Sequence, residues 1–368
     1  MISRARARIV TAAATVAPAA MVAAAGFVIQ QAARGAGWLA RRGPGWPLNG
    51  PLASGPAGPA WRASPLAPVP PWLPPGRVVN LPGRGEVFAR DSGGAPGDPA
   101  VLLLHGWTAS ADLNFFAVYA GLAGFYRVIA LDHRGHGRGM RSVEPFSLED
   151  CADDAAALLD QLGTGQVIVV GYSMGGPIGL LLARRHPGRV AGLVMQATAM
   201  EWHRSPHERT AWQLLPVLEL GLRLGTGAGI IERVLRHAIR QAPELDIYRP
   251  WLAAELRRGL ARELTDAGHA LSHYDAEPWA AQLGLPAAVL ITARDRLVRP
   301  AKQRQLAAAL CAEVLEVDAD HDLPFVKGTE YAQLTMRAVD TVAAATAMPA
   351  RTRLPRPGRR RGSTRDPA

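Results

Sequence analysis

Short, uninterrupted apolar runs recur through the middle of the chain and alternate with stretches that have helical periodicity. Strands that are apolar at every position are typical of a parallel sheet covered by helices on both faces. Two earlier strands, joined by a Pro-Gly-Arg-Gly turn, are expected to pair antiparallel. The pattern predicts an α/β fold with a mostly parallel central sheet, whose strands are 77–81, 86–91, 100–104, 127–131, 166–170, 190–195, 287–292 and 313–317.

One long segment interrupts this alternation. Residues 199–280 contain no strand pattern, and their periodicity predicts helices such as 229–241 and 251–265. An insertion between two strands of an open sheet lies over the carboxyl ends of the strands, where such sheets bind ligands. We therefore predict a helical lid, inserted after the sixth strand of a catalytic domain that spans residues 77–346.

The two ends of the chain differ from this domain. Within residues 1–42, three arginines precede an uncharged, alanine-rich run of about the length that crosses a bilayer. This predicts a signal or membrane anchor, hence a membrane-associated or exported protein; a cytoplasmic protein with a soluble extension is the alternative. Residues 43–76 contain eleven prolines and read as a linker. Residues 347–368 form a basic tail that we expect to be disordered.

The net charge of +10 belongs to these ends, because the residues between them are close to neutral. No basic face or recognition motif in the middle supports nucleic-acid binding, whereas basic ends can attract anionic lipid. The only cysteines, Cys151 and Cys311, are expected to be unpaired core thiols. The oligomeric state stays open.

The motif with the clearest chemistry is Gly171-Tyr172-Ser173-Met174-Gly175, which directly follows a strand and precedes a helix over 174–185. In this context, G-x-S-x-G places the serine on a sharp turn at the top of the sheet, and the glycines avoid collisions with the neighbouring backbone. A structural glycine-rich turn is the alternative. The motif predicts that Ser173 is a nucleophile.

A serine hydroxyl needs a base to remove its proton and an acid to orient that base. His321 follows the last strand and Asp295 follows the strand before it, in the expected chain order of serine, acid and histidine. We predict a triad of Ser173, Asp295 and His321. Glu201 is the rival acid. Asp320 and Asp322 flank the histidine and are expected to face solvent.

The developing oxyanion needs two backbone donors. The amide of Met174 and the amide of Trp107, in the loop after strand 100–104, are the candidates. Trp107 and Tyr172 are also expected to contact the substrate, and His105 is expected to be structural. The later loop with His133 and His136 lacks a third metal ligand and the end of a phosphate loop, so neither a metal nor a cofactor is predicted.

These motifs resemble the α/β-hydrolase superfamily, in particular its lid-bearing esterases, monoacylglycerol lipases and haloperoxidase-like members. The resemblance covers about residues 77–342 and implies an acyl-enzyme mechanism without metal or cofactor. Two positions depart from the family pattern, because Arg294 precedes the acid and Asp320 precedes the base where glycines are usual. Epoxide hydrolases and dehalogenases share the fold but use an aspartate nucleophile, whereas this chain has Ser173.

We therefore expect a hydrolase of carboxylic esters, with a small-molecule or lipid ester as substrate. The lid contains an apolar series that could shelter an acyl chain or simply pack against the core: Trp202, Trp212, Leu214, Leu215, Val217, Leu218 and Leu220. A perhydrolase of the haloperoxidase-like kind or a carbon–carbon bond hydrolase would use the same triad. A non-enzymatic binding protein on the same scaffold is the remaining alternative.

Overall fold

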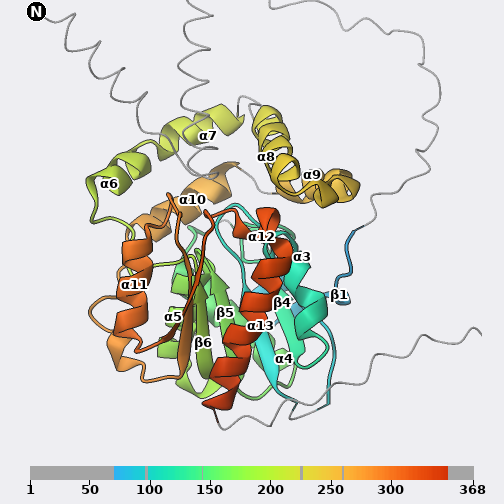
Figure 1. The fold of residues 1–368 in the computed structure, drawn as a ribbon, viewed down its shortest axis with the longest axis vertical. Helices are drawn as coiled ribbons and strands as arrows, with labels where there is room; N and C mark the ends of the chain where they lie inside the picture. Colours follow the sequence, from blue (N-terminus) through green and yellow to red (C-terminus); the bar gives the residue numbers. More distant parts are fainter. Residues whose placement is uncertain (1–69, 96–97, 143, 224–226, 259–260, 347–368) are drawn as a thin grey trace, which may run out of the picture.

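The computed structural model describes residues 70–95, 98–142, 144–223, 227–258 and 261–346 (Figure 1). Its centre is one eight-stranded sheet in the order β1-β2-β4-β3-β5-β6-β7-β8. Every predicted strand is present, with ends that differ from the prediction by at most two residues. The strands are β1 (Gly76–Leu81), β2 (Gly85–Asp91), β3 (Ala100–Leu104), β4 (Arg127–Leu131), β5 (Val167–Tyr172), β6 (Val190–Gln196), β7 (Ala287–Thr292) and β8 (Glu313–Val317).

The directions in which these strands pair determine where their carboxyl ends lie. β1 pairs antiparallel with β2, and β2 pairs antiparallel with β4. All remaining neighbours, from β4 to β8, are parallel. The carboxyl ends of these parallel strands therefore meet at a single edge of the sheet. The predicted α/β fold with a mostly parallel sheet is confirmed.

Helices cover both faces of the sheet, because its central strands are buried on both sides. α4 (Leu148–Gln161), α5 (Gly175–Arg185) and α11 (Pro300–Ala309) pack on one face, while α3 (Ala111–Leu122) and α13 (Gly328–Ala344) pack on the other. Strand side chains alternate between the two layers of core: Leu102 and Leu104 join one layer, Val101 and Leu103 the other. Each such buried side chain contributes about 1.5–3 kcal/mol by leaving water.

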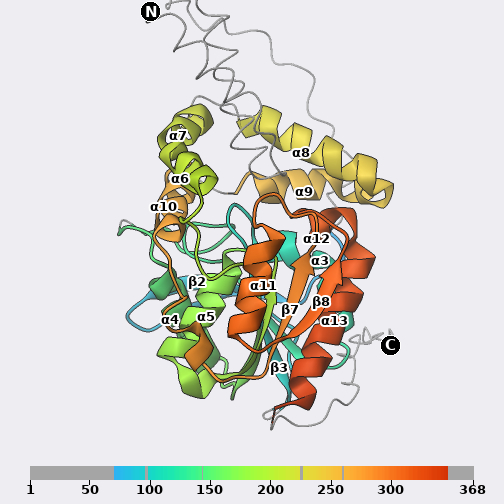
Figure 2. The same ribbon diagram turned by 60° about the vertical axis from the view of Figure 1, so that its left-hand side comes forward.

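Further helices lie between β6 and β7 and stand over the carboxyl ends of the strands (Figures 1 and 2). We call them the helical segment; they are α6 (Pro206–Gln213), α7 (Leu215–Arg223), α8 (Gly227–Gln241), α9 (Arg249–Leu256) and α10 (Ala261–Ser272). The position agrees with the predicted insertion, although opening and closing as a lid stays a prediction. Shorter helical elements elsewhere are α12 (Leu323–Val326) and the 3₁₀ turns Pro187–Arg189, Pro243–Tyr248 and Ala280–Gln282.

One predicted helix is wrong in its extent. The single helix expected over 251–265 is two helices, since α9 ends at Leu256 and α10 begins at Ala261. The sequence has a glycine at 259, and glycine supports a helix poorly. The apolar spacing nevertheless continues across this position, because both helices pack on the same domain. The spacing therefore did not reveal the break between them.

The helical segment enters and leaves the domain at adjacent points. Glu201 and Asp275 form an isolated antiparallel bridge, and the amide of Ala276 donates to the carbonyl of Met200 at 2.8 Å. Lys302 on α11 contacts Glu201 at 2.5 Å and Glu208 at 2.6 Å. The base of the segment is thus tied to the sheet.

The predicted anchor or signal (1–42), most of the linker and the basic tail lie outside the described residues. Within the described ranges, no helix combines the length and apolar character needed to cross a bilayer. Both cysteines are unpaired, as expected; Cys151 is buried, whereas the predicted core position is wrong for Cys311, which is exposed. Cys311 occupies the turn before β8 with a φ of 49°.

Candidate active site

Ser173 occupies a strained turn between β5 and α5. Its φ is +54°, a region that few residues other than glycine adopt, and its side chain is buried. The amide of Ser173 donates to the carbonyl of Gln196 at 2.9 Å, and the carbonyl of Ser173 accepts from the hydroxyl of Thr198 at 2.7 Å. Neighbouring strand β6 and the residues after it therefore hold the turn in place.

Two glycines of the motif permit this turn. A Cβ added at Gly171 would lie 2.4 Å from the carbonyl oxygen of Gly175, and a Cβ added at Gly175 would lie 1.9 Å from that of Leu104. Real side chains do not approach backbone so closely. The glycines are required because strand, turn and helix touch one another, which is the physical content of the G-x-S-x-G spacing.

The structure brings the three predicted triad residues together at the carboxyl edge of the sheet. His321 Nε2 lies 3.0 Å from the Oγ of Ser173, and His321 Nδ1 lies 2.8 Å from the Oδ2 of Asp295. All three side chains are at most 5% exposed. The arrangement can transfer a proton from the hydroxyl to the imidazole, with the carboxylate orienting the ring.

Four further donors hold the carboxylate of Asp295. Its Oδ2 accepts from the Thr292 hydroxyl at 2.7 Å and from the Gln303 amide at 3.3 Å. Its Oδ1 accepts from the backbone amides of Leu297 at 2.9 Å and Val298 at 2.8 Å. Because both oxygens are fixed, the carboxylate presents one defined edge to His321.

The rival acid, Glu201, has other partners. Besides its ion pair with Lys302, its carboxylate accepts from the amides of His203 and Arg204, each at 3.0 Å. These contacts join Glu201 to the base of the helical segment. Asp295 therefore faces the imidazole, and Glu201 does not.

The aspartates that flank His321 are not simply solvent-facing, which corrects the expectation. Asp320 Oδ1 accepts from the amide of His321 at 2.8 Å and from the amide of Arg296 at 3.1 Å, so it links the two loops that carry the base and the acid. Asp322 is half-buried and contacts His237 Nε2 on α8 at 3.2 Å. Burial, together with the charge of Asp320, raises the pKa of Asp322.

The loop after β3, which we call the oxyanion loop (residues 105–110), lies against the nucleophile. A Cβ added at Gly106 would lie 3.1 Å from the Cβ of Ser173. Thr108 has a φ of +61°, a strained value for a β-branched residue. Within the described part of the chain, the amides of Trp107 and Met174 donate to no protein acceptor. Both are free to donate to a developing oxyanion.

Two residues expected to contact the substrate have different partners in the structure. The hydroxyl of Tyr172 donates to the carbonyl of His321 at 2.7 Å, and its side chain is 2% exposed. The indole of Trp107 donates to the carbonyl of Leu264 on α10 at 2.7 Å. The polar groups of both side chains therefore hydrogen-bond to protein carbonyls rather than to a substrate. These are tertiary contacts, which the sequence alone does not show.

A family model for the alpha/beta hydrolase fold matches residues 99–222, which include the oxyanion loop and the nucleophile turn. The eight-stranded sheet and the order of Ser173, Asp295 and His321 agree with that match. The chain has the α/β-hydrolase fold.

The relatives of the chain carry the names of several kinds of enzyme. The chain is 33% identical over 120 residues to epoxide hydrolase B of Mycobacterium tuberculosis, a match that spans 32% of this chain and 34% of the relative. It is 29% identical over 220 residues to 3-oxoadipate enol-lactonase 2 of Acinetobacter baylyi, spanning 59% of this chain and 78% of the relative. The enol-lactonase of Burkholderia xenovorans LB400 has a similar structure, with a TM-score of 0.61 and 22% identity, over 71% of this chain and 98% of that one.

Three histidines form a buried cluster behind the oxyanion loop. The ring centroid of His105 lies 4.3 Å from that of His133 and 5.6 Å from that of His136. His105 contacts the carbonyl of Gly106 through Nδ1 and accepts from the amide of His133 through Nε2, which gives it the structural role expected. Burial lowers the pKa of His105 to about 4 and that of His136 to about 3. Among the described residues, no set of side chains has the geometry of a metal site.

Sequence reasoning missed a buried ion network beside this cluster. Arg138 contacts the carboxylates of Asp112 at 2.8 Å, Asp132 at 3.1 Å and Glu255 at 3.3 Å, all three at most 3% exposed. The surrounding carboxylates raise the pKa of Arg138, although burial opposes them. The only signal in the sequence is an acidic residue at a buried position of α9, which helical periodicity alone does not connect to Arg138.

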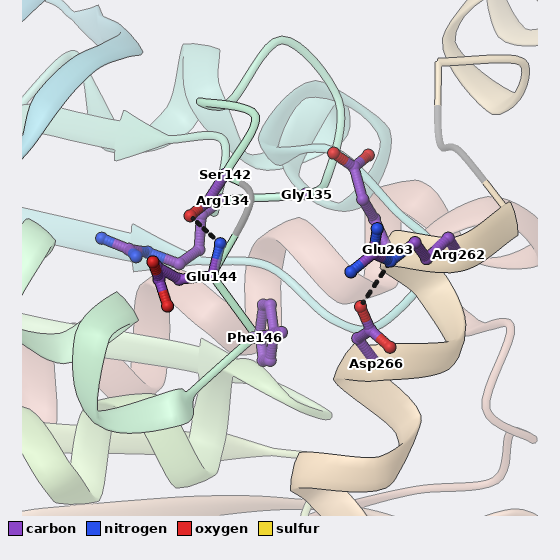
Figure 3. Close-up of a pocket in the computed structure, with 8 residues that line it drawn as sticks. All are labelled: Arg134, Gly135, Ser142, Glu144, Phe146, Arg262, Glu263 and Asp266. Atoms are coloured by element: carbon purple, nitrogen blue, oxygen red, sulfur yellow. Dashed lines mark hydrogen bonds and ion pairs between the residues drawn. The ribbon is translucent and has the colours of Figure 1, made fainter.

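A cleft of about 200 Å³ lies between α10 and the loop after β4 (Figure 3). Several of its charges have ion-pair partners, because Arg134 contacts Asp154 at 2.8 Å and Glu263 contacts Arg141 at 2.9 Å. We assign no ligand to it. The cleft is lined by Arg134, Gly135, Ser142, Glu144, Phe146, Arg262, Glu263 and Asp266.

Proposed function

We propose that the protein is a serine hydrolase that cleaves carboxylic esters through an acyl-enzyme intermediate. The observation that carries the proposal is the continuous hydrogen-bonded series from the Ser173 hydroxyl through the His321 imidazole to the Asp295 carboxylate. A serine hydroxyl without such a base is a poor nucleophile. Burial of all three side chains, with Ser173 in a strained, glycine-flanked turn, is costly for a purely structural role.

The reaction follows from this geometry. His321 Nε2 accepts the proton of Ser173 as Oγ attacks the ester carbonyl, and the amides of Met174 and Trp107 stabilise the oxyanion. The tetrahedral intermediate collapses as His321 returns the proton to the leaving alcohol. Water then attacks the acyl-enzyme, again with His321 as base, and releases the acid. Asp295 stabilises the imidazolium in both halves of the cycle.

The enol-lactonases among the relatives support ester chemistry. The names of the enol-lactonases refer to a lactone, and a lactone is a cyclic ester. The epoxide hydrolase match covers about a third of that relative. Enzymes of that kind use an aspartate nucleophile, whereas Ser173 holds the nucleophile position here. An ester or lactone is therefore the substrate class we propose.

We propose that the acyl part is apolar and of short to medium length, within reach of lipid esters. Of the apolar side chains in the helical segment, Trp202 and Leu215 are buried against the domain, which agrees with a packing role. Val217 and Leu220 on α7 are exposed and available to an acyl chain.

Labelling with a fluorophosphonate probe, followed by peptide mapping, tests the proposal. We expect the probe on Ser173 in the wild type and none in Ser173→Ala. Ser272→Ala is a matched control, because Ser272 is buried but hydrogen-bonds only within the helical segment, and it should label fully. A panel of p-nitrophenyl esters of increasing chain length then defines the acyl preference. An unlabelled, folded wild type would overturn the proposal.

A further inference from the structure

The helical segment holds the oxyanion loop through the side chain of Trp107. The indole N–H donates to the carbonyl of Leu264 on α10 at 2.7 Å, and the ring lies 5.8 Å from that of Trp212 on α6. The same ring packs closely on Gly268, since a Cβ added there would lie 3.0 Å from Cζ2 of Trp107. Two helices of the segment therefore fix the residue whose backbone amide is the proposed oxyanion donor.

A second contact holds the other end of the loop. The hydroxyl of Ser110 donates to Oε2 of Glu255 on α9 at 3.0 Å, and Arg138 and Arg258 contact Oε1 of the same carboxylate at 3.3 and 2.9 Å. Glu255 is 3% exposed. Arg258 belongs to the same helical segment, whereas Arg138 and Ser110 belong to the core domain, so two of the three partners of this carboxylate are present only when α9 is docked.

We infer that Trp107, through its side chain, and Glu255 are positioning residues for the reaction, and that docking of the helical segment completes the oxyanion hole. The inference rests on the proposed ester hydrolysis. Thr108 is held at a strained φ of +61° between the two contacts. Strain of this kind persists only where surrounding structure over-determines it. Undocking would release the loop and move the Trp107 amide away from the oxyanion.

The oxyanion donors and the catalytic base should therefore respond differently when the helical segment is disturbed. Oxyanion donors act on the transition state and little on the ground state, so their misplacement lowers kcat rather than raising KM. The hydrogen bonds of His321 to Ser173 and Asp295 do not involve the helical segment. The helical segment also reaches the loop of His321 through the contact of His237 with Asp322, which substitutions at Trp107 and Glu255 do not alter, so these substitutions should leave the pH profile of the reaction unchanged.

Three variants test the inference: Trp107→Phe removes the indole donor, Glu255→Gln removes the charge, and Gly268→Ala places a Cβ against the Trp107 ring without altering either residue. We expect each to lower kcat about ten- to a hundredfold with KM within about threefold. Inhibition by a boronic acid, whose serine adduct is tetrahedral, should weaken in parallel. The midpoint of the kcat/KM pH profile should stay unchanged.

Trp251→Phe is the matched control. Trp251 is also 7% exposed and lies on α9, but its ring packs on that of Phe116 on α3. Its kcat should stay within about twofold of the wild type.

Three outcomes would count against the inference. It is wrong if the variants keep wild-type kcat, if KM rises alone, or if the pH midpoint moves with kcat as general loosening would cause. If fluorophosphonate does not label the wild type at all, the proposed function fails and the inference falls with it. If the wild type is labelled but kcat is unaffected in all three variants, the inference is overturned and the proposed function stays intact. The variants are Trp107→Phe, Glu255→Gln and Gly268→Ala.

Discussion

The phenol of Tyr172 donates a 2.7 Å hydrogen bond to the main-chain carbonyl of His321, and the two rings lie 5.5 Å apart. The residue before the nucleophile thus holds the loop that carries the base. Both side chains are at most 5% exposed, so the bond is shielded from water. The contact joins the end of β5 directly to the loop after β8, across the strands that separate them in the sheet.

Tyr172→Phe should lower kcat about five- to tenfold, with little change in KM. A buried hydrogen bond is worth about 1 kcal/mol, and its loss leaves the carbonyl of His321 unpaired beside the reacting atoms. Steady-state kinetics with a p-nitrophenyl ester measures both constants.

The matched control for this substitution is Tyr331→Phe. The hydroxyl of Tyr331 is equally buried, but it donates to the side chain of Gln196 at 2.9 Å and does not touch His321. It should cost stability and leave kcat near the wild-type value. Equal losses of kcat in the two variants would contradict a specific role for the Tyr172 bond.

Asp295→Asn should lower kcat about 10⁴-fold while the far-ultraviolet circular dichroism spectrum stays unchanged, because the amide favours the wrong imidazole tautomer. Glu201→Gln, a comparable change at the rival acid, should leave kcat within about tenfold because its partners are Lys302 and two backbone amides. A reversed result would identify Glu201 as the acid.

The chain has only two lysines, and they should differ in their effect on stability. Lys302→Met should lower the free energy of unfolding by about 3 kcal/mol, because it leaves the buried Glu201 carboxylate without its cation. Lys327→Met should change it by less than about 1 kcal/mol, since Lys327 pairs with Glu330 at the surface. Urea unfolding followed by fluorescence compares the two; equal effects would argue against the buried pair.

Acid should destabilise the folded protein through the histidine cluster. The unfolded chain binds protons at these histidines near pH 6.5, whereas burial holds the pKa of His105 at about 4 and that of His136 at about 3. Stabilisation by the neutral rings is therefore complete above pH 6.5 and is lost as the pH falls towards 4 and then 3. We expect Tm to fall by about 5–10 °C between pH 7 and pH 4.5 in differential scanning calorimetry.

His133→Leu checks the origin of this effect. His133 is 1% exposed, neither ring nitrogen has a hydrogen-bond partner among the described residues, and burial lowers its pKa well below the usual value. Leucine of similar volume removes the buried polar atoms, so Tm at pH 7 should be maintained or rise. The decline of Tm in acid should become shallower, and an unchanged decline would assign the acid sensitivity to other groups.

Local sequence determined the strands and the nucleophile turn. Continuous apolar runs identified the six strands from β3 to β8 within two residues, because a strand buried on both faces tolerates few polar side chains at any position. The Pro-Gly-Arg-Gly turn identified β1 and β2 as an antiparallel pair. The glycines on either side of Ser173 identified the turn because only glycine permits such close backbone contact. These signals lie within a few residues of each other, so a single sequence contains them in full.

Tertiary structure decided what each polar side chain contacts. Asp295 and Glu201 both follow strands, and only the register and twist of the sheet bring the former to His321. Trp107 reaches Leu264 across 157 positions of the chain, and Glu255 reaches Ser110 across 145. Contacts at such separations depend on how the helical segment packs over the sheet, and burial then selects the one arrangement in which buried charges and donors are paired.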